Sequence, residues 1–141
     1  MKIHHLGYLV KRAEESERVF GDMGYQKETD WICDTERKIS VIFLSKDGYR
    51  VELILPMGTD SPYYSLLGRF RNTVYHICYE TENYEEADRW LRQNGFVCTE
   101  EPKPAIAFNN REVSFYAHPH MGMVELLITT TARENTDVPV Y

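Results

Sequence analysis

The chain of 141 residues repeats a pattern of its own sequence at a fixed spacing. Placing His5 on His76 gives an offset of 71 (76 minus 5), and the same offset without gaps aligns further identical or similar residues. The aligned pairs are Tyr8 with Tyr79, Glu14 with Glu85, Glu15 with Glu86, Arg18 with Arg89, Gly24 with Gly95, and Tyr25 with Phe96. Both halves also end alike, with VELI at 51–54 and VELL at 124–127. Such self-similarity predicts two copies of one structural unit.

Each copy is predicted to contain a strand, a helix and three further strands, from the periods of its apolar residues and its turn residues. In the first copy these elements are expected at 3–10, 12–23, 25–33, 38–45 and 49–55, with a hairpin turn at 46–48. In the second copy they are expected at 75–80, 83–95, 96–100, 111–118 and 122–129. The sequence therefore predicts a single α+β domain. Its parts are module 1 over about 1–56, a linker with a helical turn over 57–72, module 2 over about 73–130 and a loosely held C-terminal tail over 131–141.

Composition limits the partners and the environment that fit this chain. Apolar residues make up 43%, which is enough to form a buried core. The net charge of −6 argues against nucleic acid or an anionic membrane surface as a partner. Cys33, Cys78 and Cys98 show no C-x-x-C spacing, so neither a disulfide framework nor a thiolate zinc site is indicated. The N-terminal apolar run is too short for a signal peptide, and we expect a cytoplasmic protein without a membrane span.

Two histidines and two glutamates occupy matching places in the two copies: His5, Glu52, His76 and Glu125. Side chains alternate between the two faces of a strand, and the neighbours of each of these four residues are mostly apolar. All four should therefore point away from the face that packs on the helices. His4 shares the helix-packing face with Leu6 and Tyr8 and is not included in the set.

Two imidazoles and two carboxylates on one face favour a divalent transition metal, and we expect one ion per chain, of Ni, Co, Zn or Mn. Such an ion can act as a Lewis acid while a glutamate acts as the general base. Taken singly, each histidine could be structural and each glutamate could face solvent. The recurrence of the same pair of residue types at the same register in both copies favours the metal site.

Several other residues keep two interpretations. Arg37, Arg50, Asn110 and Arg111 either contact an anionic substrate or are ordinary surface residues. Tyr63 and Tyr64 either pack within the linker or form a lid over a ligand.

The stretches HHLGYLV, YRVELILPMGTDSP, YHICYE and GMVELL, within residues 2–128, resemble the vicinal oxygen chelate (glyoxalase/bleomycin resistance/dioxygenase) superfamily. The similar branch is that of methylmalonyl-CoA epimerase and small bacterial glyoxalase I. The resemblance implies two βαβββ modules whose mixed sheet curls around a metal cleft. It places the metal ligands at His5, Glu52, His76 and Glu125. It further implies a homodimer, with Glu125 as the general base and Glu52 mainly a ligand.

The resemblance also implies the reaction. The expected enzyme is a metal-dependent isomerase or lyase that moves a proton next to a thioester or hemithioacetal carbon through a metal-held enediolate. Its small-molecule substrate would be an acyl-CoA or a thiol adduct of methylglyoxal. One alternative is a metal-free binding or resistance protein of the same fold, against which the complete ligand set argues. The other is an iron dioxygenase with two His and one Glu, against which Glu52 argues.

Overall fold

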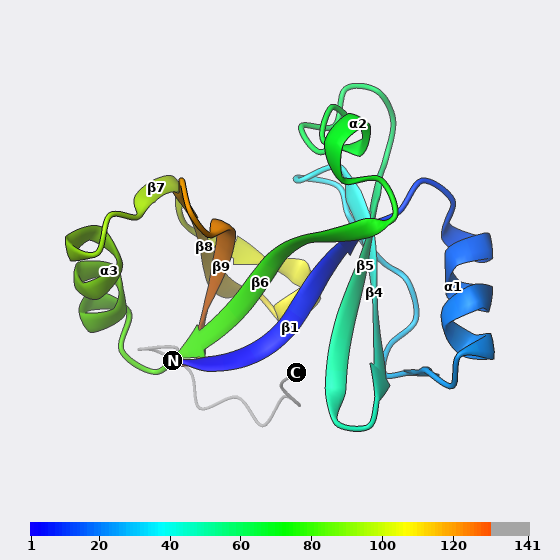
Figure 1. Ribbon diagram of the computed structural model, residues 1–141, viewed down its shortest axis with the longest axis horizontal. Helices are drawn as coiled ribbons and strands as arrows, with labels where there is room; N and C mark the ends of the chain where they lie inside the picture. The colour runs from blue at the N-terminus through cyan, green and yellow to red at the C-terminus, as the bar shows by residue number, and fades with distance from the viewer. Residues whose placement is uncertain (131–141) are drawn as a thin grey trace. The chain divides into compact units, whose positions relative to one another are not determined.

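The computed structural model describes residues 1–130, and the expected tail over 131–141 lies outside them (Figure 1). The chain divides into two compact units. Among the described residues, the first unit comprises 5–75 and the second comprises 1–4 and 76–130. The first strand, β1 (Lys2–Leu9), contributes residues to both units.

The first unit is a mixed sheet with one main helix. After β1 come α1 (Ala13–Asp22), β2 (Gln26–Lys27), β3 (Ile32–Asp34), β4 (Ile39–Lys46), β5 (Tyr49–Pro56) and α2 (Leu67–Phe70). The strand order is β2-β4-β5-β1, and β3 also pairs with β4. β1 and β5 run parallel, whereas the pairs that involve β4 are antiparallel. Figure 1 shows α1 beside the hairpin of β4 and β5.

The core of the first unit follows the alternation expected from the sequence. Its buried residues are Val10, Ile42, Leu44, Val51 and Leu53, with Tyr8, Phe20, Tyr25, Trp31 and Leu55 packed against them. The β4–β5 turn was also expected correctly. Asp47 and Gly48 have φ values of 53° and 83°, as the tight hairpin turn requires at both central positions.

The prediction of one strand over 25–33 is wrong, because the structure has two short strands, β2 and β3, in this region. The ladder against β4 is interrupted at Phe43. The backbone N–H of Phe43 donates to the side-chain oxygen of Thr29 at 3.1 Å, and its carbonyl accepts from the Glu28 N–H at 2.8 Å. Between the β2–β4 pairing and the β3–β4 pairing, four residues (28–31) lie opposite only two residues of β4. This mismatch is a β-bulge.

The second unit repeats this plan. It contains β6 (Thr73–Thr81) from His76 onward, α3 (Tyr84–Gln93), β7 (Val97–Ala105), the 3₁₀ helix η1 (Ile106–Phe108), β8 (Arg111–His118) and β9 (Gly122–Ile128). The strand order is β6-β9-β8-β7, with β6 and β9 parallel and the other pairs antiparallel. Ala87, Leu91, Tyr116 and Leu126 form the buried cluster beneath α3. The N-cap Asn83 accepts a hydrogen bond from the Glu86 N–H, which fixes the start of α3.

β7 is longer than the expected strand at 96–100, because it continues through Pro102 and Pro104 to Ala105. It lies at the end of the strand order. Proline lacks a backbone N–H but is tolerated on such an edge strand. Within residues 1–130, no helix is both long and apolar enough to span a membrane.

Candidate metal centre

The first unit brings together His5 and Glu52. β1 and β5 are parallel neighbours in which Gly7 is in register with Glu52, and His5 lies two residues before Gly7 on the same face. His5 Nε2 is 3.5 Å from Glu52 Oε1. Both residues are buried, with exposed fractions of 1% and 5%.

The second unit brings together His76 and Glu125 in the same way. β6 and β9 are parallel, Cys78 is in register with Glu125, and His76 lies two residues before Cys78. His76 Nε2 is 3.4 Å from Glu125 Oε1, and both residues are buried. The internal repeat of the sequence thus corresponds to a repeated His–Glu pair.

The spacing and chemistry of each pair fit ligands of one metal ion. Imidazole nitrogens and carboxylate oxygens bind ions such as Zn²⁺ at about 2.0–2.2 Å, so two neighbouring ligands lie about 2.8–3.1 Å apart around an octahedral ion and about 3.3–3.6 Å apart around a tetrahedral one. The observed 3.5 and 3.4 Å are near these separations and exceed the usual N–H···O hydrogen-bond length of about 2.7–3.2 Å. Burial of a carboxylate is costly without a compensating charge, which a divalent cation supplies.

Each pair is accompanied by a buried phenylalanine that the sequence reasoning missed. The rings of His5 and Phe43 are 5.5 Å apart at 73°, and those of His76 and Phe115 are 5.8 Å apart at 81°. Each phenylalanine is also in register with the glutamate of its unit. The signal was present in the repeat, since VIF at 41–43 and VSF at 113–115 occupy matching positions.

The arginines considered for substrate contacts mostly have partners within their own unit. Arg37 is buried, and its Nη1 lies 3.3 Å from Asp34 Oδ2. Arg50 Nε is 2.7 Å from Glu28 Oε2. Arg111 is partly buried, and burial lowers the pKa of its guanidinium.

The remaining candidates lie in loops. Asn110 is exposed, has a φ of 63° and donates its backbone N–H to Ala105. The Tyr63 ring packs edge-on against Tyr75 at 6.3 Å, which fits the linker-packing interpretation, whereas Tyr64 is 46% exposed.

The family comparison covers most of the chain. A family model described as the Glyoxalase/Bleomycin resistance protein/Dioxygenase superfamily matches residues 4–115. Mitochondrial methylmalonyl-CoA epimerase of Mus musculus is 24% identical over 87 residues, which are 61% of this chain and 49% of that protein. Ethylmalonyl-CoA/methylmalonyl-CoA epimerase of Cereibacter sphaeroides is 29% identical over 87 residues, which are 61% of this chain and 64% of that protein. The match thus spans about half the length of the mouse relative and less than two thirds of the bacterial one.

Solved structures share the fold. A hypothetical protein from Bacillus halodurans superposes with a TM-score of 0.79 at 20% identity, covering 95% of this chain and 98% of that one. A variant of Streptomyces coelicolor methylmalonyl-CoA epimerase in complex with 2-nitronate-propionyl-CoA superposes with a TM-score of 0.71 at 20% identity, covering 93% and 99%.

Proposed function

Because the chain belongs to the Glyoxalase/Bleomycin resistance protein/Dioxygenase superfamily, we propose that its two His–Glu pairs together bind one divalent metal ion and catalyse proton transfer on an acyl-CoA. The single observation that carries this proposal is the repeated pair, with Nε2–Oε1 distances of 3.5 and 3.4 Å in the two units. The reaction would be an epimerisation next to a thioester.

Ligand number supports one shared centre rather than two separate ones. Structural zinc sites use four protein ligands and catalytic sites generally use three, with a position left for water or substrate. Neither pair alone reaches three ligands. His5 and Glu52 combined with His76 and Glu125 supply four, which would leave open positions on an octahedral ion.

The choice of an acyl-CoA substrate rests on the relatives. The mouse and Cereibacter sphaeroides proteins are named as epimerases of methylmalonyl-CoA, and the Streptomyces coelicolor enzyme was solved with a propionyl-CoA nitronate. These names favour the epimerase over the glyoxalase I activity. The chain matches only part of the first two proteins, so the substrate assignment belongs to this proposal.

The residues of the chain would divide the work as follows. The ion, when bound, would supply positive charge that stabilises negative charge on the thioester carbonyl oxygen. Glu125 would accept the proton from the neighbouring carbon, and its burial keeps bulk water from competing for that role. Glu52 would remain mainly a ligand. His5 and His76 would hold the ion, and a proton delivered from solvent to the opposite face of the carbon would complete epimerisation.

The test is proton exchange at the substrate carbon. Purified protein loaded with Co²⁺ is incubated with methylmalonyl-CoA in D₂O, and deuterium at the carbon next to the thioester is measured by mass spectrometry. We expect incorporation that stops when a chelator removes the metal and resumes when Co²⁺ is restored. If no deuterium enters methylmalonyl-CoA but a methylglyoxal–thiol adduct is converted, the activity is that of glyoxalase I and not of an epimerase. Absence of both reactions would refute the proposed function.

A further inference from the structure

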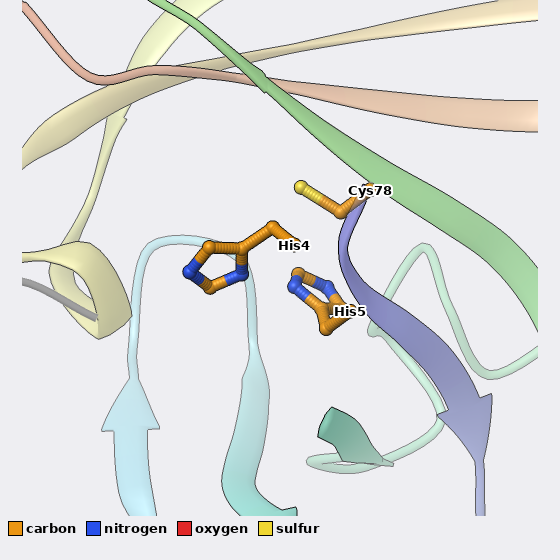
Figure 2. Close-up of side chains that lie close together, drawn as sticks. All are labelled: His4, His5 and Cys78. Atoms are coloured by element: carbon orange, nitrogen blue, oxygen red, sulfur yellow. The ribbon is translucent and has the colours of Figure 1, made fainter. Parts of the chain in front are cut away.

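A buried thiol and a buried imidazole that the proposed reaction does not use lie together in the second unit. Cys78 of β6 is 0% exposed, and His4 of β1 is 6% exposed. A donor atom of His4 lies within 4.8 Å of the Cys78 sulfur. Figure 2 shows both side chains together with His5, the residue that follows His4 on β1. The Cys78 sulfur points to the side on which the His4 ring lies.

The contacts of these two donors include an aromatic ring and a backbone carbonyl. The edge of the His4 ring packs against Phe108 of η1, with centroids 5.6 Å apart at 78°. Phe108 is itself only 2% exposed. The Cys78 sulfur lies 3.7 Å from the carbonyl oxygen of Tyr79, which is a long contact for a weak S–H donor.

We propose that His4 and Cys78 bind a thiophilic cation of the Zn²⁺, Cd²⁺ or Cu⁺ class at a site distinct from the two His–Glu pairs. A thiolate and an imidazole are donors that select such ions. With bonds of about 2.3 Å to sulfur and 2.1 Å to nitrogen, the two donors lie about 3.6 Å apart around a tetrahedral ion and about 4.4 Å apart around a linear one. Both separations agree with the structure, in which the His4 donor atom and the Cys78 sulfur lie within 4.8 Å of each other. Binding breaks the S–H bond, forms a sulfur–metal bond and releases one proton to solvent.

The position of Cys78 gives this site an effect on the proposed reaction. Cys78 is in register with Glu125 on the neighbouring strand and lies two residues after His76 on the same face of β6. A cation held by the Cys78 sulfur lies beside Glu125, the residue assigned as proton acceptor in the proposed reaction. Thiophilic ions in excess should therefore inhibit. This inhibitory role rests on the proposed function, whereas the binding of the cation does not.

Binding is tested by titration with Cd²⁺, followed by the thiolate-to-cadmium charge-transfer band in the ultraviolet. The reference protein is the full chain with Cys33→Ser and Cys98→Ser, which leaves Cys78 as its single thiol. We expect one cadmium–thiolate band per chain in the reference protein. Adding Cys78→Ser should abolish the band, and adding His4→Leu should weaken binding by roughly tenfold or more. Adding His5→Ala should leave the band in place.

Each other outcome overturns a stated part of the proposal. An unchanged affinity in His4→Leu would remove the imidazole from the site, and a missing band in the reference protein would remove the site altogether. Circular dichroism checks folding, and His4→Asn repeats the test if the leucine variant does not fold. Loss of the band in His5→Ala would show that the thiol belongs to the proposed His–Glu centre. A wild-type protein that binds no Co²⁺ but keeps the cadmium band would refute the proposed function and leave the thiophilic site standing.

The inhibitory role has its own readout. Deuterium exchange into methylmalonyl-CoA is measured in the Co²⁺-loaded reference protein with increasing Cd²⁺. We expect Cd²⁺ to inhibit the exchange, and we expect the Cys78→Ser derivative to need at least a tenfold higher Cd²⁺ concentration for the same inhibition. Inhibition of equal strength in both proteins would show that cadmium acts elsewhere.

Discussion

Replacing Phe115 with leucine tests whether an aromatic contact orients a metal-binding histidine. The Phe115 ring is buried and meets the His76 ring edge-on at 5.8 Å and 81°. Such a contact contributes about 0.5–1.5 kcal/mol beyond simple burial. Leucine fills most of the same volume but has no flat ring against which the imidazole can pack, so His76 gains rotational freedom.

The expected effect on metal binding is larger than the effect on folding. Loss of a residue that supports a metal ligand typically weakens metal binding by about 10–100-fold. For one of the two pairs we expect about tenfold, which corresponds to about 1.4 kcal/mol. A hydrophobic substitution of similar volume costs less than about 1.5 kcal/mol in stability. Phe43→Leu should behave in the same way, because Phe43 meets His5 at 5.5 Å and 73°.

The assay is titration with Co²⁺, read from the visible absorption of the bound ion. The control is Phe96→Leu, because Phe96 packs against Trp90 and His118 in the same unit rather than against His76. We expect the control to bind Co²⁺ like the wild type. An unchanged affinity and an unchanged cobalt spectrum in Phe115→Leu would show that the ring serves packing alone, and would refute the orienting role.

Three further predictions follow from the same structure. Glu125→Gln should retain metal yet lose about 10²–10⁴ in turnover, whereas Glu52→Gln should lose much less, measured as deuterium exchange at matched metal occupancy; the opposite ranking would reverse the two roles. Tyr116→Phe should destabilise the fold by about 1–2 kcal/mol in urea unfolding, because its hydroxyl donates to Asp88 at 2.6 Å. Burial alone would raise the pKa of Asp88, but hydrogen bonds outweigh it and lower that pKa below the ordinary 3.8. The stabilisation is therefore present above about pH 4 and lost as the pH falls through the folded-state pKa, so the mutant and wild type should converge in acid. Gly95→Ala should lower the free energy of unfolding by more than about 1 kcal/mol, because Gly95 has a φ of 86° after α3. Equal urea midpoints for the variant and the wild type would contradict this.

The strands that carry the two pairs were predictable because two independent patterns in the sequence agree. The internal repeat identifies matching positions, and strand alternation assigns a face to each of them. Val51 and Leu53 face the core of the first unit, as expected, and Glu52 between them is paired with His5. The same agreement holds around Glu125 in the second unit.

What was missed depends on contacts between residues far apart in the chain. The break between β2 and β3 arises where the side-chain oxygen of Thr29 accepts a hydrogen bond from the backbone N–H of Phe43. No local sequence pattern predicts this hydrogen bond. β7 continues through two prolines because it is an edge strand, and edge position is a property of the assembled sheet. The position of Cys78 beside Glu125 follows only from the pairing of β6 with β9.

Counting the bound metal ions tests whether the two His–Glu pairs share one ion. Wild-type protein is loaded with Co²⁺, freed of excess metal and analysed for cobalt per chain, alongside His5→Ala and His76→Ala. We expect one ion per wild-type chain and a large loss of bound cobalt in each variant, although the two histidines belong to different units. Two ions per wild-type chain, or one ion retained with unchanged affinity in either variant, would contradict a shared centre.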